Sequence, residues 1–569
     1  MSEENPGQAT RPAQSRRALL QQRLMELAGA APTPQRIERR GEDGPAPLSF
    51  AQQRLWFLEQ LEPGTPFYNT WAVHEYRGAL DEDAMERALR EVVRRHETLR
   101  TRFVAAGVEP VQVAGGWEGF RLPRADLRGI ADAGREGEVR RAVSRLVRAP
   151  LDLEAGPPLR AALLRSGEGE WVLALVIHHA VSDGWSFGIL FRELFALYTA
   201  FAGGLSSPLP ELAIQYADFA VWQREHLAGE RLEEQLTYWR GELEGAPEVL
   251  DLPADRPRPP VPSRRGGRHV FRVPPELAER LRAIAQEERA TLFMVLLSGF
   301  QVLLSRYSGQ EDVVVGTPIA NRNRREVEEL IGFFVNTLAL RADLAGDPTF
   351  RGLLAQTRRR TLSAYAHQDL PFERLVEELA PERTLSHAPL FQVLFALQNT
   401  ASSPAAELPG VRVRAREAHS GIAKFDLSLS MEEYSGGVAG SLEYALDLFD
   451  PATAERIGRH LVTLLEAVAA DPGRRISELP MLAPDETRRL VEEWSAAETG
   501  PVPSDRCVHE LFAEQAARTP DAVALVWGEA TLTYAELDRR SDRLAHVLAA
   551  RGVGPDVRVG VCVERSPEL

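Results

Sequence analysis

The chain contains very little cysteine: only Cys507 and Cys562 among 569 residues, both near the C-terminal end. Two cysteines cannot supply a disulfide framework or a cysteine-rich metal site, and such low usage is typical of a reducing compartment. Positive charge is also in deficit, because 82 acidic residues oppose 67 basic ones and give a formal net charge of −15. That balance argues against nucleic acid or an anionic membrane as a partner. We therefore expect a cytoplasmic protein.

The sequence also lacks a long apolar run. The first 40 residues contain no apolar segment of the length that a signal peptide needs. The longest apolar stretch, residues 292–304, is interrupted by Ser298, Gly299 and Gln301. A membrane-spanning helix needs about 20 predominantly apolar residues. We expect this stretch to be a buried core helix.

Helix and strand patterns alternate through the dense part of the chain, which begins near residue 48. Apolar residues at helical spacing after Asp81 predict a helix over 82–97 with Asp81 as its N-cap. Runs of β-formers predict strands at 111–113 and 171–177, and a further helix begins near Ser186. The fold class is therefore α/β.

A segment rich in proline and arginine, residues 252–262, separates two halves with the same kind of elements. Strands are predicted at 269–273 and 313–315 in the second half, so we expect two similar lobes. The predicted divisions are an N-terminal segment at 1–44, an N-terminal lobe at 45–225, a C-terminal lobe at 226–480, a linker at 481–507 and an incomplete unit at 508–569 that includes a strand at 557–563.

The N-terminal segment contains an amphipathic pattern at residues 19–27. It is compatible with a helix packed on the body and equally with a docking element for a partner protein. The sequence does not separate the two interpretations.

Two adjacent histidines, His178 and His179, end the apolar strand at 171–177. Side chains alternate across a strand, so the two rings should point to opposite faces and cannot form a zinc site together. The pattern predicts one working imidazole, one buried partner, and a turn at Asp183 and Gly184. Taken alone, such a pair is more often part of a core than of a catalytic site.

Six further segments accompany this one in a fixed order. The seven motifs are 49–56 (SFAQQRLW), 95–103 (RHETLRTRF), 178–186 (HHAVSDGWS), 216–222 (YADFAVW), 331–337 (IGFFVNT), 367–373 (HQDLPFE) and 385–391 (LSHAPLF). Together they resemble the condensation domain of nonribosomal peptide synthetases over residues 48 to about 480. Residues 508–569 resemble the opening of an adenylation domain, whose first core motif matches 532–537, without its glycine-rich ATP-binding motif.

The resemblance implies two lobes like chloramphenicol acetyltransferase, arranged as a V, followed by an incomplete α/β adenylation fragment. It implies formation of an amide from a donor aminoacyl or peptidyl thioester and an acceptor aminoacyl amine. Both substrates would be carried on the 4'-phosphopantetheine of carrier proteins, the donor from an upstream carrier in trans and the acceptor from a downstream carrier. We expect no cofactor or metal in the condensation domain itself; ATP and Mg²⁺ would serve only a complete adenylation domain.

The chemistry needs a neutral amine, whereas an α-amino group has a pKa of roughly 8. Histidine is suited to accept its proton or to hold the amine through a lone pair. The resemblance assigns this task to His179, and the choice between base and positioning group stays open. Ser182 is a poor nucleophile candidate because no exposed elbow presents it, so direct transfer is preferred to an acyl-enzyme.

The remaining motif residues are expected to support the site. A buried Asp183 needs a cationic partner, and the resemblance assigns Arg322 to it, which would link the two lobes. Gly184 would permit a tight turn, and its amide is a candidate oxyanion donor. His178 would shape the site as well. We assign four motif residues to structural roles: Arg95, Arg100, Trp222 and Asn336.

Four alternative functions differ from this one in identifiable ways. An epimerisation domain would follow a carrier domain, and a heterocyclisation domain would have aspartate in place of His178. A starter-type domain would transfer a fatty acyl group to the first amino acid. A catalytically silent recruitment platform would need none of the three residues His178, His179 and Asp183, and the presence of all three argues against it.

Overall fold

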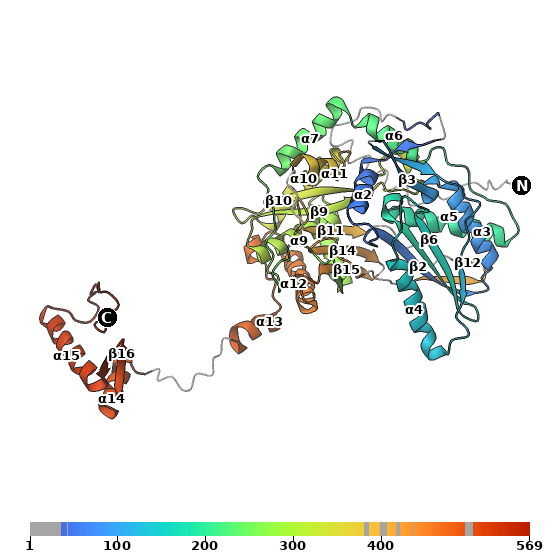
Figure 1. Cartoon of the computed structure of the whole chain (residues 1–569). Coiled ribbons are helices and arrows are strands. Elements are labelled where there is room, and N and C mark those ends of the chain that lie inside the picture. Colours follow the sequence, from blue (N-terminus) through green and yellow to red (C-terminus); the bar gives the residue numbers. More distant parts are fainter. Residues whose placement is uncertain are drawn as a thin grey trace, which may run out of the picture. The chain divides into compact units, whose positions relative to one another are not determined.

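The computed structural model describes residues 36–41, 44–107, 109–379, 386–398, 407–416, 421–434, 436–494 and 505–569. The chain divides into two compact units, Met1–Ala483 and Pro484–Leu569 (Figure 1). The amphipathic segment predicted at 19–27 lies outside the described residues. The first unit contains two sheets of six strands each, in agreement with the α/β class and the repeated lobe.

The sheet of the N-terminal lobe is built around β7 (Glu170–His178). Trp171 to Ile177 are buried, because α4 (Asp132–Arg148) packs on one face of the strand and α3 (Glu82–Arg95) and α5 (Gly184–Ala202) on the other. Asn69 lies opposite His178 in the antiparallel neighbour, so two strands end at the histidine pair. The strands in spatial order are β12 (Glu407–Leu408), β13 (Val411–Ala415), β2 (Asn69–Gly78), β7, β6 (Leu159–Gly167) and β5 (Arg124–Asp126).

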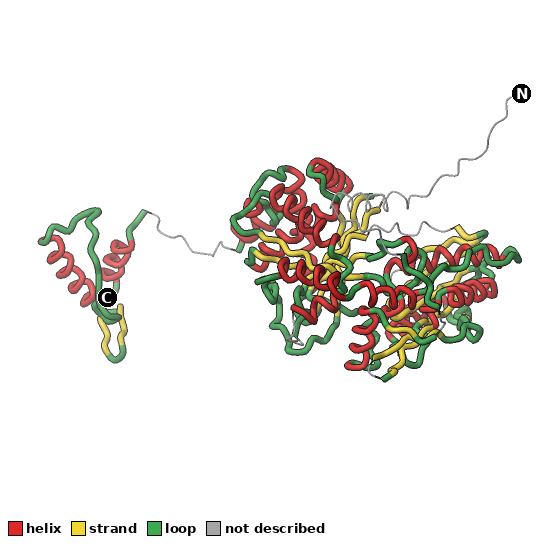
Figure 2. Tube along the Cα trace, turned by 90° about the horizontal axis from the view of Figure 1, so that it is seen from above, coloured by secondary structure: helices red, strands yellow, loops and turns green. Residues whose placement is uncertain are grey.

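The C-terminal lobe repeats this plan with a second sheet, which lies beside the first in Figures 1 and 2. The apolar stretch predicted to be a core helix is α9 (Leu292–Ser308), in which Val295 and Phe300 are fully buried against the sheet. The strands in spatial order are β10 (Asn336–Asp343), β9 (Asp312–Ile319), β11 (Val393–Gln398), β14 (Leu427–Tyr434), β15 (Gly437–Ala445) and β8 (Gly266–Val273).

Helices cover both sheets and connect them. The helix predicted over 82–97 ends at Arg95, because His96 adopts an extended conformation (φ −104°). In the N-terminal lobe the helices are α3 (Glu82–Arg95), α4 (Asp132–Arg148) and α5 (Gly184–Ala202); in the C-terminal lobe they are α8 (Pro275–Glu287), α9, α10 (Phe350–Ala366) and α12 (Pro451–Ala470); the others are α2 (Phe50–Leu61), α6 (Tyr216–His226), α7 (Gly229–Leu243) and α11 (Phe372–Leu379). A small sheet adds β1 (Ala46–Pro47), β4 (Glu109–Ala114) and β3 (Thr101–Ala106).

One strand crosses from the second half of the chain into the first lobe. β13 pairs with β2 in antiparallel register, with Val411 opposite Gly78. The segment 226–480, predicted to be the C-terminal lobe, therefore also contributes to the N-terminal sheet. A Cβ at Gly78, which has a φ of +138°, would lie 2.0 Å from the carbonyl oxygen of Gly410, so glycine is required where the strands meet.

In its described residues, the second unit contains a two-stranded sheet and four helical segments. The strand predicted at 557–563 is wrong: residues 557–563 form no strand, and Val559 and Val561 are exposed. An extended segment needs a hydrogen-bonding neighbour, and the two strands of this unit pair with each other. Its elements are α13 (Pro484–Arg488), a π-helical turn (Arg489–Glu493), α14 (Val508–Arg518), β16 (Val523–Trp527), β17 (Ala530–Thr533) and α15 (Tyr534–Ala550).

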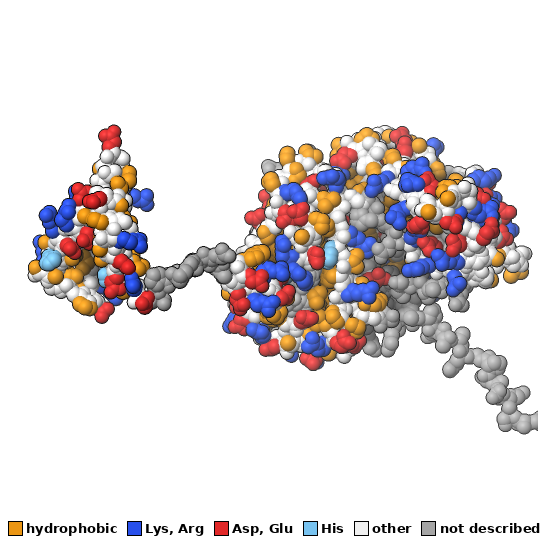
Figure 3. All heavy atoms as spheres, turned by 90° about the horizontal axis from the view of Figure 1, so that it is seen from below, with side chains coloured by type: hydrophobic (Ala, Val, Ile, Leu, Met, Phe, Trp, Pro, Cys, Tyr) orange, Lys and Arg blue, Asp and Glu red, His pale blue; other side chains and the backbone are white. Residues whose placement is uncertain are grey.

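Within the described ranges, no single helix is long and apolar enough to cross a membrane; α8 and α9 meet the length and composition criteria only as a pair bent by 105°. Acidic and basic side chains are interspersed over the face of the molecule shown in Figure 3. Both cysteines are free and exposed.

Candidate active site

A large cavity lies between the two lobes and has a volume of about 1910 Å³. Its walls come from the N-terminal lobe, including His179 and Gly184, and from the C-terminal lobe, including Asn336 and Lys424. Typical sites for one small molecule measure roughly 300–1,000 Å³. The cavity is therefore larger than a typical site for one small molecule.

His178 is the buried member of the histidine pair. Its Nδ1 accepts the backbone N–H of Ala180 at 3.1 Å, and its Nε2 lies 3.9 Å from the carboxylate of Glu59. Burial is the main cause that lowers the pKa of His178 to about 3, and the proximity of His179 and Lys424 adds to it. The ring is neutral and shapes the end of β7.

His179 turns away from the strand because it begins a 3₁₀ turn, His179–Val181. Its backbone N–H donates to the carbonyl of Tyr68 at 2.7 Å, and its Nδ1 lies 2.7 Å from the carbonyl oxygen of Ser182. A carbonyl oxygen only accepts, so Nδ1 carries the proton and Nε2 keeps a free lone pair. The ring lies against Phe333, with 4.7 Å between centroids.

The same surroundings keep His179 uncharged. Burial, followed by the positive charge of Lys424, lowers its pKa to about 4, although Ser182 and Asp183 act in the opposite direction. At neutral pH the imidazole is therefore a hydrogen-bond acceptor toward the cavity. It is too weak a base to hold a full proton taken from an ammonium group whose pKa is roughly 8.

Asp183 caps helix α5 and does not touch His179 through its carboxylate. Its Oδ1 accepts the backbone N–H of Ser186 at 2.8 Å and the hydroxyl of the same residue at 2.7 Å. Its Oδ2 accepts the backbone N–H of Phe334 at 3.1 Å. Arg322 completes the set with an ion pair at 3.2 Å between Nη2 and Oδ1. The carboxylate is buried and fully engaged in structure.

Arg322 links the lobes, as the sequence resemblance implied. Its Nη1 donates to the carbonyls of Val327 and Leu330, both at 2.6 Å, and its guanidinium lies 4.2 Å from the Phe334 ring centroid. Since Asp183 begins a helix of the N-terminal lobe and Arg322 follows a strand of the C-terminal lobe, their contact fixes the segment 325–335 across the base of the cavity.

Gly184 does not form the tight turn that we expected. It is the first residue of α5, its φ is not positive, and a Cβ built on it would meet no atom within 4 Å. Gly184 is exposed and lines the cavity. The expectation of a turn at Gly184 is therefore wrong. Because this residue has no side chain, the space in front of the first turn of α5 is left open.

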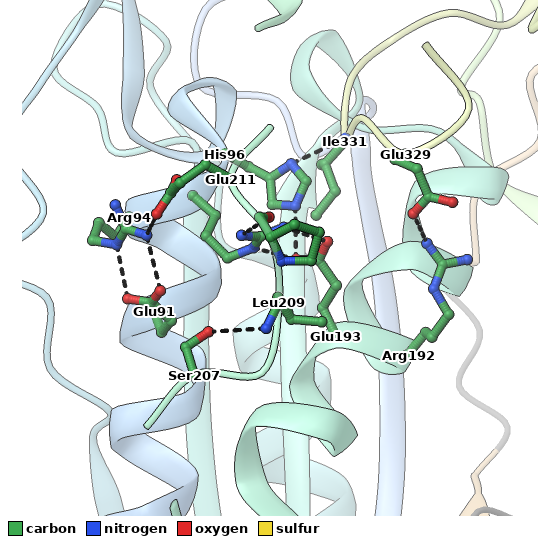
Figure 4. A network of polar contacts seen from close by, with 12 residues as sticks. Glu91, Arg94, His96, Arg192, Glu193, Ser207, Leu209, Glu211, Glu329 and Ile331 are labelled. Carbon is green, nitrogen blue, oxygen red and sulfur yellow. Dashed lines mark hydrogen bonds and ion pairs between the residues drawn. The ribbon is translucent and has the colours of Figure 1, made fainter. Parts of the chain in front are cut away.

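Arg95 belongs to a buried ion network beneath the site, of which Figure 4 shows the neighbourhood. Its guanidinium pairs with Glu193 of α5 at 3.1 Å and donates to the carbonyl of Pro210 at 2.7 Å. His96 donates to Glu193 at 3.0 Å, and its other ring nitrogen accepts the backbone N–H of Ile331 at 3.3 Å. The network joins α3, α5 and the segment 325–335.

This network predicts an acid-sensitive contribution to stability. Burial alone would raise the pKa of Glu193, but His96 and then Arg95 outweigh it and hold the pKa at about 2. A depressed carboxylate stabilises the fold above its unfolded pKa and loses that contribution as the pH falls toward 2. We expect about 3 kcal/mol to be lost between pH 4.5 and pH 2.

The measurement is urea unfolding across this pH range. In Glu193→Gln the dependence should be flatter, whereas Glu91→Gln, which removes a partly exposed partner of Arg94 on α3, should retain the wild-type slope. Equal slopes in wild type and Glu193→Gln would show that the carboxylate is not stabilised in this way.

Three other motif residues have structural contacts. Arg100 donates to the carbonyl of Gly115. The Trp222 ring stacks on His226, with 4.3 Å between centroids. The side chain of Asn336 donates to the carbonyls of Gln368 and Leu370 at 2.9 and 2.7 Å, and it accepts the N–H of Phe372.

Sequence reasoning missed two residues beside the catalytic candidate, Tyr68 and Lys424, and both line the cavity. Neither belongs to a motif with a spacing that predicts chemistry. A residue count would have found the second, because Lys424 is the only lysine in the chain. Within the described residues, no group of three or more His, Cys, Asp or Glu side chains is arranged to hold a metal ion.

The chain is similar in sequence to known synthases. One of the linear gramicidin synthase subunits from Brevibacillus parabrevis is 45% identical over 529 residues, which are 92% of this chain and 10% of that protein. The chain thus spans about a tenth of this relative.

Two solved structures are similar. The X-domain from teicoplanin biosynthesis is 33% identical with a TM-score of 0.72, covering 79% of this chain and all of that one. The first condensation domain of the calcium-dependent antibiotic synthetase, solved with a substrate analogue, is 25% identical with a TM-score of 0.65, covering 77% of this chain and all of that one.

Two family models match the chain. The model described as "Condensation domain" matches residues 42–491, and the model described as "AMP-binding enzyme" matches residues 512–569. The first match spans most of the chain and contains the histidine pair, Asp183 and Arg322. The chain therefore belongs to the condensation-domain family of nonribosomal peptide synthetases and continues into the first part of an AMP-binding region.

Proposed function

We propose that this chain forms amide bonds by direct transfer, and that His179 is its catalytic residue. The observation that carries the proposal is the neutral His179, whose Nδ1 is bound to Ser182 and whose Nε2 lone pair is free, in a cavity lined by both lobes. An acceptor of this kind orients the N–H of an incoming amine and leaves the nitrogen lone pair free to attack.

The reaction joins an acceptor amine to a donor thioester. The amine lone pair forms the new C–N bond, the carbonyl becomes tetrahedral, and its collapse breaks the C–S bond. One amine proton leaves toward His179 Nε2 and is returned to the departing thiolate, so the products are an amide and a thiol. The pKa of the His179 imidazole is about 4, so this side chain does not deprotonate an ammonium group effectively. The amine is therefore expected to bind in its neutral form.

The substrates are proposed to arrive on carrier proteins. The 4'-phosphopantetheine arm of a donor carrier would enter one mouth of the cavity and that of an acceptor carrier the other, with an aminoacyl or peptidyl donor. The volume of the cavity supports two such arms. ATP and Mg²⁺ would be used by a complete adenylation domain, of which residues 512–569 match only the beginning of the model. The cytoplasmic location stays a prediction.

The donor class is tested by supplying different donors in parallel reactions. Wild-type protein is given an acceptor carrier loaded with an amino acid and, in parallel, an aminoacyl donor carrier, a peptidyl donor carrier or octanoyl-coenzyme A. Amide formation with the carrier-bound donors supports the proposal, whereas transfer from octanoyl-coenzyme A alone would identify a starter-type enzyme.

Deletion of residues 1–40 tests the docking role of the N-terminal segment, because unchanged transfer from the donor carrier would exclude it.

Gly184 provides a test of access to the site. Gly184→Leu should fold normally, because a Cβ at this position meets no atom within 4 Å, yet its side chain would extend into the cavity. We expect amide formation to fall by at least about tenfold with a change in Tm of a few degrees at most. Gly188→Leu on the same helix is the matched control, since its Cβ also meets nothing within 4 Å and it does not line the cavity. Equal activity of the two variants would contradict the account.

A further inference from the structure

Lys424 is the only lysine in the chain, beside 66 arginines. A sequence that has arginine at every other cationic position has no general need for lysine, so the exception indicates a local demand. A guanidinium is planar and always charged, whereas an ammonium is compact, turns three donors freely and shifts its pKa on burial. Lys424 lies shortly before β14 and lines the same cavity as His179.

Two aromatic rings hold the ammonium beside the catalytic candidate. Its Nζ lies 5.6 Å from the ring centroid of Phe67 and 5.5 Å from that of Tyr68, within the range of cation–π attraction. The carbonyl of Tyr68 accepts the backbone N–H of His179 at 2.7 Å. Lys424 and His179 thus both contact Tyr68. Besides burial, the charge of Lys424 lowers the pKa of both His178 and His179.

The side chain of Lys424 lines the cavity. Within the described part of the chain it forms no ion pair with a carboxylate, and the side chain is exposed to the cavity space. Glu443 of β15 accepts the backbone N–H of Lys424; burial raises the pKa of its carboxyl, whereas the charge of Lys424 lowers it. Burial lowers the pKa of Lys424, and the nearby Glu443 acts in the opposite direction.

We propose that Lys424 is the oxyanion donor of the condensation site. The inference rests on the proposed function, because it assigns the second half of the same chemistry. When the acceptor amine attacks, the C=O π electrons move onto the carbonyl oxygen, and the ammonium donates to that oxygen. Collapse restores the C=O bond and expels the thiolate, which receives the amine proton by way of His179. Charges and protons balance without any further reactant.

The pairing of groups supports this assignment. The tetrahedral intermediate has a positive nitrogen and a negative oxygen, and the cavity presents a neutral acceptor, His179 Nε2, beside a cationic donor. Cation–π contacts hold the ammonium without using its N–H groups, so they stay available for the oxygen. A donor that strengthens its bond only as charge develops lowers the barrier without tightening substrate binding.

Single-turnover kinetics between loaded donor and acceptor carriers test the proposal. Lys424→Met should lower the rate of amide formation by about 10²–10³, the usual effect of losing one oxyanion donor. Lys424→Arg should not restore the rate, because the planar guanidinium occupies a different volume. The matched control is Arg264→Gln, which removes another cation from the Phe67 ring, 4.4 Å from its centroid and paired with Glu62. It should stay within about threefold of wild type.

A rate of Lys424→Met within about threefold of wild type would overturn the proposal. If the wild type itself forms no amide, the proposed function fails instead, and a binding measurement still tests Lys424. The probe is pantetheine ending in a methylphosphonate, whose charged oxygens imitate the intermediate, compared with plain pantetheine by calorimetry. Wild type and Arg264→Gln should prefer the phosphonate by roughly tenfold or more, and Lys424→Met should lose that preference. A preference that survives in Lys424→Met would exclude the oxyanion role.

Discussion

Arg322→Ala is expected to lower the free energy of unfolding by about 3–5 kcal/mol, because it leaves a buried carboxylate without its cation. Asp183 would keep its bonds from Ser186 and Phe334 but lose both contacts with Nη2. The carbonyls of Val327 and Leu330 would lose their donor as well. Denaturant unfolding followed by tryptophan fluorescence measures the loss.

The matched control for this prediction uses the same helix and the same bridging segment. Arg192 of α5 forms an ion pair with Glu329 (Figure 4), and both side chains are about half exposed. Arg192→Ala should cost at most about 1 kcal/mol, since exposed pairs contribute little. The double variant Asp183→Asn with Arg322→Met should cost less than Arg322→Ala alone, because no buried charge stays unpaired. If Arg322→Ala and Arg192→Ala cost the same, the buried pair is not what joins the lobes.

His179→Ala is expected to reduce amide formation by about 10²–10⁴, the range typical of removing a residue that handles a proton in the transition state. The fold should be unaffected, because the imidazole makes one side-chain hydrogen bond, to the carbonyl of Ser182. Single-turnover transfer and thermal unfolding of the same sample measure the two effects. A variant with full activity would remove His179 from the mechanism.

The pH dependence of wild-type activity gives an independent check on His179. Its pKa of about 4 means that the imidazole stays neutral down to that value. The acidic limb due to this residue should therefore lie near pH 4, well below the value of about 6.5 for an unperturbed histidine. The rise of activity toward roughly pH 8 should follow deprotonation of the acceptor amine. A limb at about pH 6.5 that disappears in His179→Ala would contradict the neutral environment described here.

Much of the fold was predictable because it is encoded locally. Periodic apolar residues predicted α3 and α9, and the apolar run before His178 predicted β7. The addition of β13 to the N-terminal sheet was not predictable, since pairing between Val411 and Gly78 joins residues far apart in sequence and no local pattern specifies it. The strand expected at 557–563 failed for the related reason that a strand depends on a neighbour.

The candidate site was predictable where it coincided with a motif. The division of the histidine pair into a buried and a cavity-facing ring agrees with the structure, although His179 leaves the strand through a 3₁₀ turn and not by simple alternation. The tautomer of His179 depends on its contact with the carbonyl of Ser182, which no sequence pattern specifies. Gly184 was misread because a glycine after aspartate is typical of turns, whereas here it begins a helix. Lys424 was missed because a single residue has no spacing.

Transfer of a peptidyl group between two carriers is the most direct test of the proposed reaction. Wild-type protein is mixed with a donor carrier that holds a dipeptidyl thioester and an acceptor carrier that holds an aminoacyl thioester, and both carriers are followed by intact mass spectrometry. We predict that the mass of the dipeptidyl group leaves the donor carrier and appears on the acceptor carrier, that thiol cleavage of the acceptor thioester then releases a tripeptide containing the new amide bond, and that His179→Ala largely abolishes this transfer. Loss of the group from the donor carrier with no gain on the acceptor carrier, or equal transfer by wild type and His179→Ala, would contradict it.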